Sequence, residues 1–116
     1  MLNPRDRNIL LGVIRHSERM LSKMKDVSYL NFECDEDLKE IVCFNLLQVG
    51  ELSKHLSKEF ISSFSQMPWR QIKGMRDHVA HGYETLDLEL IYNTAKEEIP
   101  ELERYCRNIL VQNKEF

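Results

Sequence analysis

Residues that interrupt regular structure are scarce in this chain. Its 116 residues include only four glycines and three prolines, so most of it is available for regular elements joined by short turns. The three cysteines, Cys34, Cys43 and Cys106, are odd in number, far apart and without metal-ligand spacing. This pattern argues against a disulfide framework and predicts reduced thiols in the cytoplasm.

Long uncharged apolar stretches are also missing. No segment approaches the ~18 consecutive apolar residues of a membrane span, and residues 1–6 lead directly into charged residues without an apolar signal region. We therefore expect a cytoplasmic protein outside the membrane. A chain of this length with 42% hydrophobic residues is sufficient for one core, so we expect a single helical domain over residues 1–116.

The chain also lacks a strongly basic composition. The net charge is −3 and the pI is near 5.8, so the surface as a whole does not attract nucleic acid. The charge is uneven, because residues 51–81 carry five Lys or Arg against three acidic residues, whereas residues 84–103 carry seven acidic residues against one lysine. A polyanion would therefore meet the centre of the chain more readily than its C-terminal third.

Apolar residues recur every three or four positions through most of the first half, which is the period of an α-helix. With Asn3 as its N-cap, the first helix is predicted to run from Pro4 to about Asp26. The stretch 27–34 loses the period and is predicted to be a loop. Asp35 is the expected N-cap of a second helix that extends to about Leu56.

The second half continues the same pattern. Ser57 is expected to cap a short helical segment, and Pro68 to stand at the beginning of the next helix. Thr85 or Asp87 would cap the last segment, in which Pro100 removes one backbone hydrogen bond and predicts a kink. The fold class predicted is all-α, an up-and-down bundle of four to five helices whose last helix is kinked at Pro100.

The densest cluster of polar residues spans residues 76–83. Arg76 offers a planar guanidinium that grips phosphate, and His81 can take and give a proton near neutrality. Metal-free RNA cleavage needs a base, an acid and a cation. On an ideal helix the two residues lie ~140° apart, so a distorted helix end, the reach of the long arginine side chain or a second subunit would have to complete such a site.

Structural roles for the same residues are the alternative. Arg and His side chains near a helix C-terminus often only bind the last backbone carbonyls and interact favourably with the helix dipole. Tyr83 could equally be a core aromatic. His78 and His81 lack the further ligands that a convincing metal site would need. His16 and His55 stand alone in helical segments and are expected to be exposed or half-buried without a functional role.

The segment Arg76, four residues, His81, one residue, Tyr83 resembles the signature of the HepT-like family of the HEPN superfamily. Flanking segments similar to those of the family lie in the family's order, at residues 45–51, 68–72, 74–76 and 99–102. The resemblance covers most of the chain, from the first predicted helix to Leu102.

This resemblance implies a helical bundle that dimerises with the Arg and His of both subunits facing one cleft. Family members are described as metal-independent endoribonuclease toxins, each paired with a small nucleotidyltransferase antitoxin that can attach AMP to the motif Tyr. By the resemblance, Arg76 would hold the scissile phosphate, His81 would transfer protons and Asp77 would orient one of them. Tyr83 would be the modification site, RNA the substrate, and no metal or cofactor would be required.

A homodimer is also expected from the residues themselves. One reason is that Arg76 and His81 lie ~140° apart on an ideal helix, so a second subunit would help to complete their site. The large apolar residues Phe60, Phe64 and Trp69 near the middle of the chain are another, because an exposed patch of them would mark an interface.

A non-catalytic module is the rival interpretation. The bundle would then be a nucleotide- or partner-binding platform for a nucleotidyltransferase, and Arg76 would bind nucleotide phosphates without cleaving RNA. The net charge of −3 favours this reading, because a dedicated RNA binder usually shows a stronger basic stripe. An open basic cleft around Arg76 and His81 would favour the nuclease.

Overall fold

The computed structural model describes residues 2–80 and 87–113, and no β-strand occurs among them. In chain order the elements are α1 (Pro4–Met24), α2 (Tyr29–Cys34), α3 (Glu36–Ser53), α4 (Lys58–Ser63), α5 (Trp69–Ala80), α6 (Leu88–Asn93), a π-helical turn (Thr94–Glu98) and α7 (Ile99–Gln112). The all-α prediction is confirmed. None of the described helices is long and apolar enough to cross a membrane.

Short polar side chains begin the helices where the sequence predicted. Asn3 accepts the backbone N–H of Asp6 at 2.7 Å, and Asp35 accepts that of Leu38 at 3.0 Å. Such caps satisfy N–H groups that the first turn of a helix leaves without partners. Ser57 and Asp87 cap α4 and α6 in the same way, whereas Thr85, the other candidate for the last cap, lies outside the described residues.

The loop predicted for residues 27–34 is wrong in part, because Tyr29–Cys34 form the helix α2. Ser28 accepts the backbone N–H of Asn31 at 3.2 Å and caps it. Phe32 is the one residue of this helix that is fully buried, and it packs beside Tyr92 of α6. A helix of six residues is too short to show a period, so only its tertiary contact reveals it.

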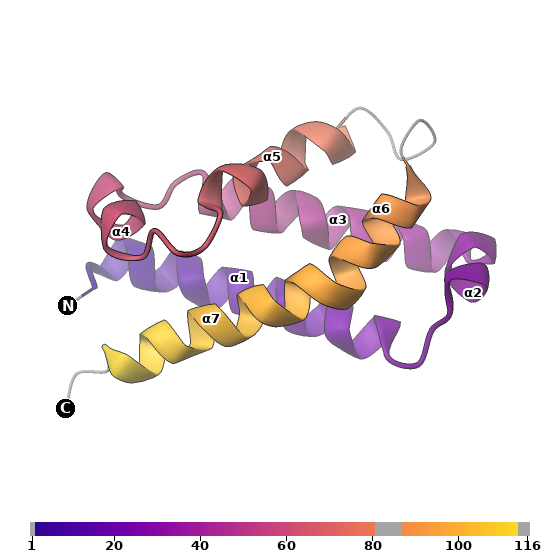
Figure 1. The fold of residues 1–116 in the computed structure, drawn as a ribbon, viewed down its shortest axis with the longest axis horizontal. Helices are drawn as coiled ribbons and strands as arrows, with labels where there is room; N and C mark the ends of the chain where they lie inside the picture. The colour runs from indigo at the N-terminus through magenta and orange to yellow at the C-terminus, as the bar shows by residue number, and fades with distance from the viewer. Residues whose placement is uncertain (1, 81–86, 114–116) are drawn as a thin grey trace.

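The break expected at Pro100 takes the form of the π-helical turn Thr94–Glu98. Proline has no N–H to donate to the carbonyl four residues back. Just before it, the N–H of Ile99 reaches the carbonyl of Thr94, five residues back, and the Thr94 hydroxyl donates to the carbonyl of Leu90 at 2.8 Å. The helix axis changes direction between α6 and α7 (Figure 1).

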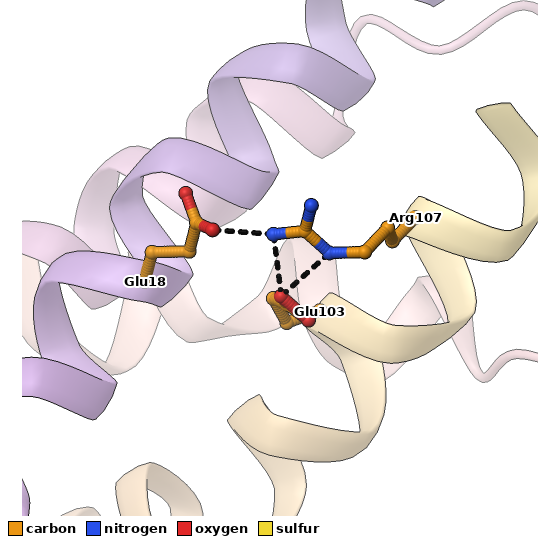
Figure 2. A network of polar contacts seen from close by, with 3 residues as sticks. All are labelled: Glu18, Glu103 and Arg107. Carbon is orange, nitrogen blue, oxygen red and sulfur yellow. Dashed lines mark hydrogen bonds and ion pairs between the residues drawn. The ribbon is translucent and has the colours of Figure 1, made fainter. Parts of the chain in front are cut away.

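The pair α1–α3 lies at the middle of the bundle, with α7 packed on α1 and α5 packed on α3 (Figure 1). The two central helices approach each other closely at Gly12. A Cβ atom built on this glycine would stand only 2.9 Å from Cδ1 of Leu52. On the side of α7, Arg107 binds both Glu103 of its own helix and Glu18 of α1 (Figure 2).

The aromatic residues of the middle segment are in the core. Phe60 and Trp69 are each only 3% exposed, and Phe64 is half-buried against the core. Their rings form a chain that continues to Tyr105 of α7, with centroids 4.8 to 6.2 Å apart. The exposed aromatic patch on which a dimer was partly predicted therefore does not exist.

Asp6 connects the beginning of α1 to the beginning of α4. Its carboxylate is 3% exposed and accepts the Ser57 backbone N–H at 2.9 Å, the Ser57 hydroxyl at 2.6 Å and the Asn3 amide at 2.9 Å. Ser57 in turn accepts the N–H of Phe60. One buried carboxylate therefore joins the cap of α1 to the cap of α4, which lies 51 residues after Asp6 in the chain.

Removing this carboxylate should destabilise the fold. We predict that Asp6→Ala lowers the free energy of unfolding by about 2–3 kcal/mol, because three hydrogen bonds to the carboxylate are lost and the partly buried Ser57 N–H is left without its partner. Urea denaturation followed by circular dichroism measures this. Arg7→Ala, next to it on the exposed side of α1, should change stability by less than about 0.5 kcal/mol. Equal effects of the two substitutions would contradict the role given to Asp6.

Candidate active site

Helix α5 carries the first part of the predicted polar cluster. Arg76 and Asp77 lie in its last two turns. Asp77 is exposed. The Arg76 side chain, His81 and Tyr83 lie outside the described residues, so their mutual arrangement stays a prediction, as does that of the His78 side chain.

The beginning of α5 is anchored in the core. The Trp69 indole N–H donates to the carbonyl of Phe64 at 2.7 Å, and the carbonyl of Pro68 accepts the N–H of Ile72 at 3.1 Å. Trp69 and Ile72 are buried, while Met75 and Val79 are packed against the core more loosely. This apolar stripe at helical spacing holds α5 on α3 and so places the backbone of Arg76.

A groove runs between α5 and the segment α6–α7. It consists of two adjoining hollows of about 320 and 160 Å³ that share Pro68, Ile72, Met75 and Glu98 as lining residues. The charged side chains among its described lining residues are Glu98 and Glu101. In its described part, the groove beside α5 is thus apolar and acidic.

The buried thiols are poor candidates for nucleophiles. Burial raises the pKa of Cys43 to about 11, and burial together with the nearby Glu103 carboxylate raises the pKa of Cys106 to about 12. A thiolate is the reactive form, so these two side chains remain neutral and act as core hydrophobes. Cys34, at the end of α2, is exposed, and all three thiols are free.

One histidine outside the predicted cluster is more constrained than the sequence suggested. His16 of α1 forms a hydrogen bond of 2.8 Å between its Nδ1 and Oδ1 of Asn45, on α3. It was expected to stand alone, and it is half-buried as predicted. The partner lies 29 residues away in the sequence, so only the packing of the two helices could reveal the pair.

Comparison with known proteins gives consistent results. A model of the family described as "Ribonuclease HepT-like" matches residues 13–109. The chain is 34% identical over 108 residues to "Putative RNase TTE0752" of Caldanaerobacter subterraneus, covering 93% of this chain and 96% of the relative. It is 32% identical over 78 residues to "Probable ribonuclease HepT" of Thermococcus cleftensis, covering 67% and 71%. No solved structure matches the chain significantly.

The thiol environments predict selective chemical labelling. At pH 8 a thiol of pKa about 11 is ionised in only ~0.1% of molecules, so Ellman's reagent should react rapidly with Cys34 alone in the folded protein. In denaturant all three thiols should react. The matched control is Cys34→Ser, which should show no rapid reaction when folded. Two or three rapid equivalents from the folded wild type would contradict the burial of Cys43 and Cys106.

Proposed function

Because the chain belongs to the ribonuclease HepT-like family, we propose that it is a metal-independent endoribonuclease acting through residues 76–83. The observation that carries the proposal is the family match over residues 13–109, which contains this whole segment. Two relatives that bear RNase names support RNA as the substrate. The three free thiols support a reducing compartment, such as the cytoplasm, as the place of action.

The proposed chemistry transfers two protons around one phosphate. His81 takes the proton of a ribose 2′-hydroxyl, whose oxygen attacks the adjacent phosphorus. The 5′-oxygen of the next nucleotide leaves and receives a proton, and a cyclic phosphate remains. Arg76 stabilises the negative charge on the phosphoryl oxygens with two parallel hydrogen bonds. Asp77 orients one of these two side chains.

A homodimer completes the proposed site. On an ideal helix Arg76 and His81 point ~140° apart, and one subunit need not place both of them against the same phosphate if a second copy faces it. General acid and general base could then come from the two copies of His81, which would let one residue type serve both proton transfers. The dimer is supported by this geometry and by the family resemblance.

A small nucleotidyltransferase antitoxin is the proposed partner, with Tyr83 as its target. A phenol is neutral at pH 7 because its reference pKa is ~10. Attachment of AMP to the Tyr83 oxygen would add a phosphate charge a few residues from Arg76. That phosphate would pair with the guanidinium in place of the RNA backbone, and the nucleotide would fill the site.

The alternative is a non-catalytic platform that binds a nucleotide or a nucleotidyltransferase. The described part of the groove beside α5 favours it, because apolar side chains with Glu98 and Glu101 at its wall suit a protein surface better than an RNA phosphate. The nuclease and the platform differ in one measurable property, which is cleavage of RNA by the purified protein.

We predict that Arg76→Ala and His81→Ala each reduce RNA cleavage by ~10²–10⁴-fold, the usual contribution of a general acid–base group or a phosphate-binding cation. The measurement is the cleavage of a labelled RNA on a gel, with circular dichroism to verify the fold. Cleavage by the wild type should persist in EDTA. Loss of activity in EDTA, or normal cleavage by either variant, would contradict the assigned roles.

The same two variants test the shared site. A mixed dimer of Arg76→Ala and His81→Ala subunits retains one intact Arg and one intact His. If both subunits contribute to one site, refolding the variants together should restore part of the activity that each lacks alone. Refolding each variant with itself is the control. Absence of any recovery in verified mixed dimers would count against a site that needs only one Arg76 and one His81 from different subunits.

Tyr83→Phe separates catalysis from its regulation. We expect this variant to retain most of the nuclease activity but to resist silencing by a cognate nucleotidyltransferase with ATP. Intact-mass spectrometry after co-incubation should show an AMP-sized gain on the wild type and none on Tyr83→Phe. An AMP-sized gain on the Phe variant, or full activity of a completely modified wild type, would contradict the mechanism.

A further inference from the structure

A second concave surface lies between α1 and α3, away from the groove beside α5. It is an open hollow of about 660 Å³, which is within the usual size of ligand sites. Arg15, His16 and Arg19 line it from α1, and Phe44 and Asn45 line it from α3. We refer to this surface, which Asp37, Glu40 and Ile41 of α3 also line, as the α1–α3 groove. The proposed function uses none of them.

The His16 ring is fixed at the floor of this groove. Asn45 is 0% exposed, and its amide nitrogen donates to the carbonyl of Ile41 at 2.7 Å, which identifies Oδ1 as the atom that faces His16. Because an amide oxygen can only accept, Nδ1 of His16 must be the donor in the 2.8 Å bond. In the neutral ring, Nε2 is then an acceptor with its lone pair available to a ligand.

The two arginines of the groove keep their hydrogen-bonding capacity. Arg15 and Arg19 are exposed and four residues apart, so they lie on one face of α1. Within the described parts of the chain, neither guanidinium takes part in a hydrogen bond or ion pair. Glu18, the carboxylate between them in the sequence, is bound by Arg107 on the side of α7 (Figure 2). Their planar donors are thus available to a phosphate.

An aromatic ring stands beside these cations. Phe44 is 57% exposed, and its ring lies 6.4 Å from that of His16 at an interplanar angle of 69°. An exposed aromatic face is a platform on which a nucleobase can stack. Asp37 and Glu40 also line the groove from α3, and their carboxylates can accept hydrogen bonds from the amino groups of a base or the hydroxyls of a ribose.

We propose that the α1–α3 groove binds one nucleotide unit of a single-stranded RNA, outside the segment that cleaves it. Arg15 and Arg19 hold the phosphate, the base stacks on Phe44, and Nε2 of His16 accepts a hydrogen bond from an amino group of the base. This assignment rests on the proposed ribonuclease function for the choice of RNA. A free nucleotide has the same chemistry, but the exposed walls of the groove leave both ends open for a continuing strand.

The test is the binding of a fluorescent 2′-O-methyl RNA decamer, which cannot be cleaved through its 2′-hydroxyls, to the full chain by anisotropy. We expect the double variant Arg15→Gln/Arg19→Gln to bind about tenfold more weakly or worse, and the slope of log affinity against log salt to fall by about 0.7, the value for one phosphate contact to a single strand. Phe44→Leu should also lose about tenfold through lost stacking, whereas Phe44→Tyr should bind normally.

The matched control is Arg7→Gln/Arg104→Gln, which also removes two positive charges, but from exposed positions on α1 and α7 outside the groove. Equal weakening by the control and the groove variant would overturn the proposal, because only net charge would then matter. Tight binding of adenosine monophosphate, equal to that of the decamer, would overturn the assignment to a strand. Conversion of a dimer to a monomer by the groove variant in sedimentation equilibrium would also overturn it, and would make the groove an interface between copies.

Cleavage of an unmodified RNA distinguishes this proposal from the catalytic one. If the wild type cleaves RNA but the groove variants bind the decamer normally, the groove assignment fails and the nuclease stands. If the wild type cleaves no RNA but its decamer binding depends on Arg15, Arg19 and Phe44, the nuclease fails and the groove stands. The expected result for an active enzyme is a raised KM with kcat nearly unchanged in the groove variants.

Discussion

The close packing of α1 on α3 is the constraint on which the other features of this protein depend. Gly12 allows the approach, because a side chain there would meet Leu52. The buried Asn45 then joins α3 to His16 of α1 through a hydrogen bond that only one register of the two helices permits. A buried polar group that is fully paired specifies an arrangement more sharply than apolar contacts do, since any shift would leave it without partners.

Two further long helices are attached directly to this pair. Helix α5 packs on α3, and α7 packs on α1, so the backbone of Arg76 and the α1–α3 groove are positioned by the same helix from different sides. The ends of the bundle are closed by other means. Asp6 joins the cap of α1 to the cap of α4, and the ring chain from Phe60 to Tyr105 connects α4, α5 and α7.

Charge explains how an acidic protein can have RNA as its proposed substrate. The net charge is −3, but not every carboxylate faces the solvent unpaired. Glu18 is bound by Arg107, and the carboxylate of Asp6 is buried among hydrogen-bond donors. Arg15 and Arg19 line the α1–α3 groove together with Asp37 and Glu40, whereas the groove beside α5 has only Glu98 and Glu101 as charged residues in its described lining. The proposed RNA strand and the proposed protein partner would therefore use different grooves, and salt screens charges that lie more than about 10 Å apart.

The local sequence by itself determined where most helices begin and where the last one is interrupted. The caps at Asn3, Asp35, Ser57 and Asp87 follow from side chains that satisfy the first N–H groups of a helix, and the break before Pro100 follows from its missing N–H. The motif of Arg76, His81 and Tyr83 is likewise visible in the residues alone, because its recognition depends on spacing along the chain. Only the tertiary structure decided the rest. The helix α2 has no period of its own, the aromatics Phe60 and Trp69 could equally have faced solvent, and His16 gained its partner from a residue in another helix. These outcomes depend on contacts between segments far apart in sequence, and such contacts form only when the helices pack in three dimensions.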